Sequence, residues 1–505
     1  MDFIDLMAKE ETVLTENGAL GYRTTGKDLL DLNFAVGSFR DADEAKIIKY
    51  FTAALAEDQT LALRWLFFAR DIRNGGMGER RLFRTCLAYV VNDFDIDFDF
   101  LYDMVEKYGR LDDFVELLNA CSLNPSAEEK VAEVISKNLA YDITNYYAKK
   151  PISLLAKWLP SINTSSAATR AKAKKLVKYW GITEAEYRKL LSGLRSYTNV
   201  VEAKISRGAW NEVDYEKVPS YANLKYSSAF LKHDRERREA YLKALEKGEA
   251  KINAGTLYPY DIVHKYGILS SRCGWYWTMP SYNYEVKPEL EALWNNLPKY
   301  NINNTLIVAD GSGSMLTPVG GTKVTALEVC YSLAIYYATH TEGDFANKFI
   351  TFSSHPEIVK LNGETLHDHL LVAREHDDCT NTDIYKTFKL VLNTAIKNKM
   401  TQEEIPDNIL ILSDMEFDAI KADKVLFERI KEEFIEAGYF MPRLIFWNLC
   451  SRTNAIPLRE NELGVALVSG FSPAIADMVM SGELDPYKVL VDKLENYKEV
   501  DKIIK

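Results

Sequence analysis

Val308-Ala309-Asp310-Gly311-Ser312-Gly313-Ser314-Met315 is the stretch that decides how the C-terminal part of the chain folds. Directly before it, residues 305–308 form a short apolar run of the kind found in a central parallel strand. After it, residues 323–340 carry apolar side chains at helical spacing. The stretch therefore predicts a buried strand that ends in a loop of small hydroxyl residues and leads into a helix.

The loop carries a carboxylate and two hydroxyls at alternate positions, namely Asp310, Ser312 and Ser314. Their oxygens fall on one side of a tight turn, and oxygen is the ligand that hard cations such as Mg²⁺ prefer. The pattern alone is weak, because most such matches are ordinary turns. Two later features strengthen it: Thr382 precedes a second helical run, and a second apolar strand leads to Asp414.

A strand ending in Asp-x-Ser-x-Ser, a later loop threonine and a second strand ending in aspartate resemble the metal-ion-dependent adhesion site of a von Willebrand factor A domain. The resemblance covers roughly residues 300–500. It implies that Ser312, Ser314 and Thr382 touch Mg²⁺ (or Mn²⁺). It also implies that Asp310 and Asp414 hold the ion mainly through water, and that the last coordination position is left for an acidic residue of a protein partner.

Apolar strands alternate with helical segments from about residue 296 onwards, which is typical of a doubly wound α/β sheet. Ligands bind such sheets at the carboxyl ends of the strands, where both predicted metal-site aspartates fall. We therefore expect residues 296–505 to form the A-like domain. Its predicted strands are Thr305–Val308, Phe349–Phe352, Ile409–Leu412, Leu444–Trp447 and Val465–Val468.

Residues 1–295 show helical spacing and almost no strand signal. Short non-helical stretches separate the helical segments. This pattern favours a HEAT-like repeat of paired helices over a compact helical bundle. No clear sequence repeat supports this prediction, which depends on the rhythm of the helices alone. Clear predicted helices are Glu44–Glu57, Thr60–Arg73, Gly78–Val91, Glu128–Ala148 and Ala167–Trp180.

Three stretches, residues 24–32, 68–81 and 157–163, resemble an uncharacterised bacterial and phage family. That family joins a helical domain similar to the TROVE module of Ro proteins to a C-terminal A domain. The resemblance covers nearly the whole chain and implies a Ro-like RNA-binding protein, acting in RNA quality control or in a small-RNA ribonucleoprotein. Ro proteins bind single-stranded RNA ends inside a ring of helical repeats and structured small RNAs on an outer basic surface.

Charge is divided unevenly along the chain. The net charge is −9 over residues 1–150, +9 over residues 151–300 and −11 over residues 301–505. An acidic protein with a basic middle has one place suited to a polyanion. The sharpest part of that middle is residues 143–183, which contain no Asp or Glu and eight Lys or Arg residues.

These eight residues are the predicted nucleic-acid contacts: Lys149, Lys150, Lys157, Arg170, Lys172, Lys174, Lys175 and Lys178. On the helix 167–180 the basic side chains spread over the side opposite the apolar ones, so we expect them to be uncompensated and exposed. The alternative is an ordinary solvated helix face. Nearby aromatic residues, Tyr146, Tyr147 and Trp158, are typical of a core but are also able to stack on bases.

Two further motifs each leave alternatives open. Arginines around Gly75-Gly76-Met77-Gly78 indicate either a phosphate site at the start of the next helix or an inter-helix turn with solvated arginines. His367-x-His369 contains zinc-type ligands, but its spacing matches no established site and favours a polar surface loop.

Several classes of protein are disfavoured. The six scattered cysteines indicate neither disulfides nor a zinc knuckle, and the N-terminus lacks a signal sequence, so we expect a cytoplasmic protein with no membrane contact. No nucleophile is paired with a histidine base, and a single hydroxyl-rich metal site is unlike a two-metal nuclease. We therefore expect a non-enzymatic protein that binds single-stranded or structured small RNA. The alternative is an adaptor without RNA, whose metal site captures an acidic residue of a protein partner.

Overall fold

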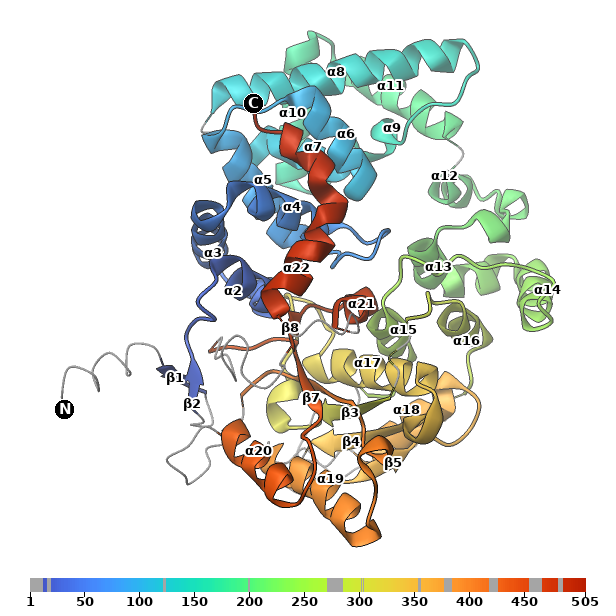
Figure 1. The fold of residues 1–505 in the computed structure, drawn as a ribbon. Coiled ribbons are helices and arrows are strands. Elements are labelled where there is room, and N and C mark those ends of the chain that lie inside the picture. The colour runs from blue at the N-terminus through green and yellow to red at the C-terminus, as the bar shows by residue number, and fades with distance from the viewer. Residues whose placement is uncertain are drawn as a thin grey trace. The chain divides into compact units, whose positions relative to one another are not determined.

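The computed structural model describes residues 12–15, 20–120, 124–198, 200–269, 285–300, 302, 304–352, 356–376, 384–416, 426–453, 466–479 and 485–505. The chain forms two compact units (Figure 1). The first, the sheet unit, combines residues 1–61 with 254–496, and the second, the helical unit, combines residues 62–253 with 497–505. The predicted boundary at residue 296 lies within the sheet unit.

A six-stranded mixed sheet forms the centre of the sheet unit, with strand order β5-β4-β3-β6-β7-β8. All neighbouring strands are parallel except the edge pair β4 and β5. The direction in which the chain adds strands changes between β3 and β6. From β3 the chain adds β4 and β5 on one side, and it then adds β6, β7 and β8 on the other side of β3. The strands are β3 (Thr305–Asp310), β4 (Lys348–Phe352), β5 (Ile358–Lys360), β6 (Asn408–Ser413), β7 (Arg443–Asn448) and β8 (Ala466–Ser469).

Helices cover both faces of this sheet (Figure 1). On one face, α19 (Ile384–Asn398) and α20 (Leu426–Glu436) pack through Phe388, Leu392 and Phe434 against alternate strand residues. On the other face lies α17 (Ala326–His340), which is buried along almost its whole length. Strands buried on both sides explain why the sequence shows continuous apolar runs rather than alternation.

The remaining elements of the sheet unit come from residues 1–61 and from residues 254–496. A short hairpin pairs β1 (Thr12–Leu14) with β2 (Leu20–Tyr22). The helices are α2 (Asp28–Phe34), α3 (Glu44–Glu57), α15 (Pro259–Tyr266), α16 (Pro288–Asn295), α18 (Leu366–Glu375), α21 (Ala476–Val479) and α22 (Pro486–Leu494). Short 3₁₀ segments are η1 (Val36–Arg40), η6 (Gly313–Leu316), η7 (Gly343–Phe345), η8 (Gln402–Glu404) and η9 (Pro473–Ile475).

The helical unit contains helices joined by short connections. It starts within α4 (Gln59–Arg70) and ends with η10 (Glu495–Lys502), where Tyr497 packs its ring against Phe68 and Tyr108. The others are α5 (Arg80–Asp93), α6 (Phe98–Tyr108), α7 (Leu111–Ala120), α8 (Pro125–Tyr147), α9 (Leu155–Trp158), α10 (Ala167–Trp180), α11 (Glu184–Tyr197), α12 (Val201–Ser206), α13 (Ser220–His233) and α14 (Arg235–Glu246), with η3 (Trp210–Glu212) and η4 (Tyr215–Lys217).

The structure confirms the coarse prediction of helices followed by an α/β sheet. Two predicted helices, Glu44–Glu57 and Ala167–Trp180, have the observed bounds, and all five predicted strands are present within a residue or two. The antiparallel edge strand β5 was not predicted, because its three residues carry one buried side chain and no apolar run. Among the described helices, none has the length and apolarity needed to cross a membrane.

Candidate metal centre and nucleic-acid interface

The two predicted metal-site aspartates come from adjacent parallel strands. Ala309 of β3 is in register with Leu412 of β6, so Asp310 and Ser413 end the two strands side by side. The Ser413 hydroxyl donates to Asp310 Oδ2 at 2.5 Å, and Asp414 follows directly. Since the strand order reverses between β3 and β6, this is the switch point at which doubly wound sheets bind their ligands.

The loop after β3 folds back over the first carboxylate. The Ser312 amide donates to Asp310 Oδ1 at 2.9 Å, which closes a tight turn, and the chain then enters η6. The Ser312 and Ser314 hydroxyl oxygens lie 2.9 Å apart, and the Ser314 hydroxyl also bonds to Asp414. The geometry thus brings together four of the five predicted ligands.

Charge in this cluster is poorly balanced. Asp310 and Asp414 are both buried. Burial, and then the negative charge of Asp414, raise the pKa of Asp310 to about 7, while burial raises the pKa of Asp414. Arg452 Nη2 lies 3.0 Å from Asp414 Oδ2, whereas none of the main contributions to the pKa of Asp310 comes from a cation. Among the described residues, the ion pair in this cluster therefore joins a partly exposed guanidinium to Asp414, and Asp310 is held by hydroxyl and amide donors.

The position of Arg452 is fixed by a residue that the sequence analysis missed. Glu416 is buried, and its Oε1 accepts from the amides of Arg452 at 2.9 Å and Thr453 at 3.0 Å and from the hydroxyl of Ser451 at 3.2 Å. These bonds tie the loop after β7 to the loop after β6. In the sequence, Glu416 is visible as a second carboxylate two residues after Asp414. No local pattern indicated which residues bond to it.

Residues near the N-terminus border the same edge of the sheet. Asn448 Nδ2 donates to the Phe34 carbonyl, and the Gly37 amide donates to Ser469 Oγ at 2.7 Å. A Cβ at Gly37 would lie 2.4 Å from the Leu449 carbonyl oxygen, so only glycine allows this approach. Farther along, the Asp41 carboxylate accepts from the amides of Gly320 and Gly321, which follow the serine loop. No local pattern of residues indicated this arrangement.

The donor set suits a hard cation. No group of three or more His, Cys, Asp or Glu side chains suited to a metal occurs in the described ranges. The cluster instead combines two carboxylates with two hydroxyls, a set suited to Mg²⁺, which binds oxygen and keeps several waters. Thr382, the fifth predicted ligand, lies outside the described residues.

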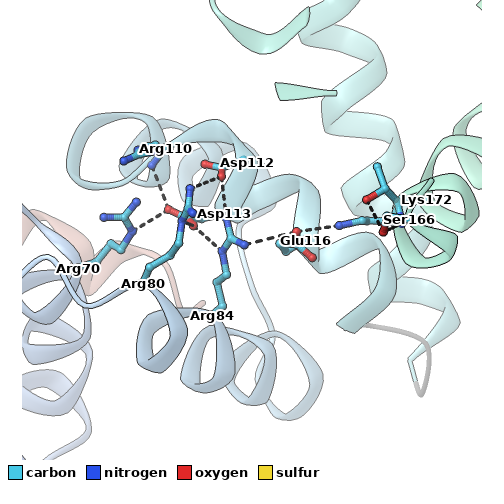
Figure 2. A network of polar contacts seen from close by, with 10 residues as sticks. Arg70, Arg80, Arg84, Arg110, Asp112, Asp113, Glu116, Ser166 and Lys172 are labelled. Carbon is cyan, nitrogen blue, oxygen red and sulfur yellow. Dashed lines mark hydrogen bonds and ion pairs between the residues drawn. The ribbon is translucent and has the colours of Figure 1, made fainter. Parts of the chain in front are cut away.

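Several basic side chains predicted to be uncompensated are paired with acids. Their partners come from other helices, which explains why a segment without Asp or Glu suggested free charge. Lys172 is buried, with its Nζ 2.7 Å from Glu116 of α7 (Figure 2). The other pairs are Lys157–Glu202 at 3.5 Å, Lys174–Glu184 at 3.9 Å and Lys175–Glu128 at 2.7 Å, while Arg170 donates to the carbonyls of Thr164 and Ser165.

Three of the eight predicted nucleic-acid contacts remain available to bind a phosphate. The side chains of Lys149, Lys150 and Lys178 are exposed and form no ion pair with any residue that the structure describes. Of the aromatic residues, Trp158 is partly buried beneath the Arg110 guanidinium, whereas Tyr147 is exposed. The available positive charge therefore lies at the end of α8 and on the outer side of α10.

The arginine-flanked glycine loop is a turn between α4 and α5, as one of the two alternatives predicted, and Arg73, Arg80 and Arg81 are exposed. The amides of Met77, Gly78 and Glu79 already bond to carbonyls at the end of α4 and just after it, which leaves these donors unavailable to a phosphate. Two of the arginines differ from that prediction, because Arg70 and Arg84 bind Asp113 at 2.7 and 2.6 Å (Figure 2). Asp113 is buried, and although burial raises its pKa, the charges of Arg70 and Arg84 lower it overall.

His367 and His369 are not in a surface loop. Both are buried in the first turn of α18, and Glu291 caps this helix by accepting from the Leu366 and His367 amides at 2.8 and 3.1 Å. Burial lowers the pKa of His369, which favours its neutral form. The two histidines are part of the packing between α16 and α18.

Comparison with known proteins gives likenesses without a described activity. Residues 304–502 match the domain of unknown function DUF7788, and residues 15–93 and 165–284 match the domain of unknown function DUF2828. The chain is 29% identical to the uncharacterized protein L728 of Acanthamoeba polyphaga mimivirus, across 96% of this chain and 87% of that protein. The two domain matches and the viral relative together indicate an uncharacterised family.

Proposed function

We propose that this chain is a non-enzymatic RNA-binding protein, similar to Ro proteins, with a von Willebrand factor A-like domain that binds Mg²⁺ or Mn²⁺ and recruits a protein partner. The observation that carries the metal part is the buried pair Asp310 and Asp414 at the switch point of the sheet, with hydroxyls beside it and a deficit of positive charge. A bound cation would supply that charge.

Each residue of the cluster has a role in this proposal. Ser312 and Ser314 offer their hydroxyl oxygens directly, and Asp310 and Asp414 accept from water molecules around the ion. Asp310 is held for this by the Ser312 amide and the Ser413 hydroxyl. The cation, when bound, attracts a carboxylate from outside the chain, which is how an acidic residue of a partner would be recognised.

Support for RNA binding comes from the helical unit and from the resemblance to Ro proteins. The exposed lysines at the end of α8 and on α10 provide positive charge that no described acid neutralises. Four of the remaining basic residues pair with acids of other helices, and Arg170 bonds to the carbonyls before its own helix, so these five are not assigned to RNA. HEAT-like pairing of the helices is part of the same proposal.

Titration calorimetry tests the metal site, with Mg²⁺ and Mn²⁺ added to the wild type and to Asp310→Asn. We expect binding to the wild type and a loss of at least about tenfold in affinity in the variant, because a carboxylate is replaced by a neutral amide. If the wild type and Asp310→Asn bind the metal with equal affinity, the assignment of the metal site to Asp310 is wrong.

RNA binding is tested by fluorescence anisotropy with an unstructured oligouridylate of about 15 nucleotides. The logarithm of the affinity should fall linearly with the logarithm of salt, by about 0.7 per phosphate contact on a single strand. Asp310→Asn should leave this affinity unchanged, because its oxygens are in the sheet unit. A wild type without affinity for the RNA at low salt would favour the adaptor function instead.

A further inference from the structure

The end of α8 carries a group of tyrosines that the sequence reveals only in part. The Tyr146 ring centroid lies 5.3 Å from that of Tyr147 and 5.1 Å from that of Tyr197, which belongs to α11. Tyr147 is 79% exposed and Tyr197 is 36% exposed. We call these three residues the tyrosine platform. Aromatic rings that could have been buried in the core instead face solvent.

Two lysines are held next to the platform by backbone hydrogen bonds. The Lys149 amide donates to the Tyr146 carbonyl at 3.1 Å, and the Lys150 amide donates to the Asn145 carbonyl at 2.8 Å. The Tyr197 hydroxyl donates to the Lys150 carbonyl at 3.0 Å, which joins α11 to this helix end. The positions of rings and lysine backbones are therefore fixed relative to one another.

The charge beside the platform is uniformly positive in the nearby sequence. Lys149 and Lys150 are exposed, and the acid closest to them in the sequence, Asp142, is buried and bonded to Ser153. Lys149 has φ +55°, a left-handed conformation that glycine adopts at lower cost at the end of a helix. A lysine is therefore present where the backbone alone would favour glycine.

We infer that the tyrosine platform, with Lys149 and Lys150, is a binding site for single-stranded nucleic acid. Bases stack on the exposed faces of Tyr147 and Tyr197, and the two ammonium groups contact the phosphates. A protein partner is the weaker fit, because lysine is depleted at protein interfaces whereas a polyanion needs it. This inference rests on the proposed RNA binding and assigns its site.

Anisotropy with the oligouridylate described above tests the inference on the full-length protein. Tyr147→Ala should weaken binding about 5- to 100-fold through loss of stacking, whereas Tyr147→Phe, which keeps the ring, should bind as the wild type does. Tyr221→Ala is the matched control, since Tyr221 is an exposed tyrosine of α13. It should leave affinity unchanged.

Lysine-to-glycine substitutions separate charge from folding. Lys149→Gly suits the left-handed backbone and should not lower the melting temperature, yet it should weaken RNA binding and reduce the salt slope by about 0.7. Lys399 provides a matched control, because it has φ +53° at the end of α19 and is also exposed. Lys399→Gly should keep full affinity.

The outcomes distinguish the inference from the proposed function. A wild type that binds the oligouridylate while Tyr147→Ala and Lys149→Gly bind it equally well would overturn the platform and leave RNA binding in place. A wild type that does not bind it at low salt would overturn both. Photocrosslinking of an oligonucleotide containing 5-iodouridine, followed by mass spectrometry, should place the crosslink on Tyr147 or Tyr197, and crosslinks confined to other helices would relocate the site.

Discussion

Each unit of the molecule buries an aspartate among polar side chains, and the two aspartates are compensated differently. In the helical unit, Asp113 lies 2.7 Å from Arg70 and 2.6 Å from Arg84, and these charges lower its pKa despite the opposing effect of burial. In the sheet unit, Asp310 receives only hydroxyl and amide donors in the described chain, and burial together with Asp414 raises its pKa.

The difference teaches that burial of a carboxylate does not by itself indicate a binding site. Transfer of a charge out of water costs several kcal/mol unless a partner offsets it. Asp113 has its partners within the chain, so its cluster holds α4, α5 and α7 together (Figure 2). Asp310 and Asp414 share far less positive charge, and a cation from solution would offset the remainder.

The largest expected effect is the loss of the helical cluster. Asp113→Asn keeps the shape of the side chain but leaves the buried Arg70 without its anion, and we expect a loss of about 3–5 kcal/mol in the free energy of unfolding. Hydrogen exchange of α5 and α7 measures it. Asp112→Asn is the control, since Asp112 is less buried, and it should cost clearly less. Equal losses for the two variants would contradict the comparison.

An aspartate-to-asparagine substitution should have the opposite effect on stability in the sheet unit. Without divalent metal, Asp310→Asn removes a repulsive buried charge, so the melting temperature should rise. Mg²⁺ at about 100 times its Kd should stabilise the wild type by about 2.7 kcal/mol and should not stabilise the variant. Differential scanning calorimetry with and without EDTA checks both signs. A variant that is less stable than the metal-free wild type would show that Asp310 is compensated like Asp113.

Local patterns predicted what depends on neighbours in the sequence. The strand that ends at Asp310 and the strand that ends just before Asp414 follow from apolar runs, and the helix Glu44–Glu57 follows from its spacing. Adjacent parallel strands then bring the two aspartates together, as the alternation of strands and helices implies. This is why most of the candidate metal site could be predicted.

Pairings between distant helices could not be predicted in the same way. Lys172 and Glu116 lie on α10 and α7, and no local signal links them. The contact of Tyr197 with Tyr146 and the approach of Gly37 to Leu449 depend equally on tertiary packing. Consequently, the segment without acids suggested free positive charge, whereas acids of other helices and of helix termini neutralise half of it.

A fall in pH should also change the stability contributions of the two buried aspartates, Asp310 and Asp113, in opposite directions. The pKa of Asp310 is raised in the fold, so without metal the sheet unit takes up a proton on folding and should gain stability as pH falls through about 7, by at most about 1.4 kcal/mol per pH unit. The pKa of Asp113 is lowered, so its contribution is complete above about pH 4 and lost at lower pH. Urea unfolding between about pH 5 and pH 8 should show the gain in the wild type and not in Asp310→Asn.

The smallest expected effect concerns Arg452, the cation that the sheet unit does supply. Its side chain is 38% exposed, so its pair with Asp414 should contribute only about 0–1 kcal/mol to stability, and Arg452→Gln should fold normally. Removing the guanidinium makes the cluster more negative, so the affinity for Mg²⁺ should rise a few-fold in calorimetry. Arg84→Gln in the helical unit is the counterpart. It should destabilise more, because Arg84 binds Asp113 and Asp112 together. If Arg452→Gln instead lowers the affinity for Mg²⁺, the guanidinium holds the residues around the ion in place and does not compete with the ion for Asp414. The charge deficit at Asp310 and Asp414 is then smaller than the comparison with Asp113 requires.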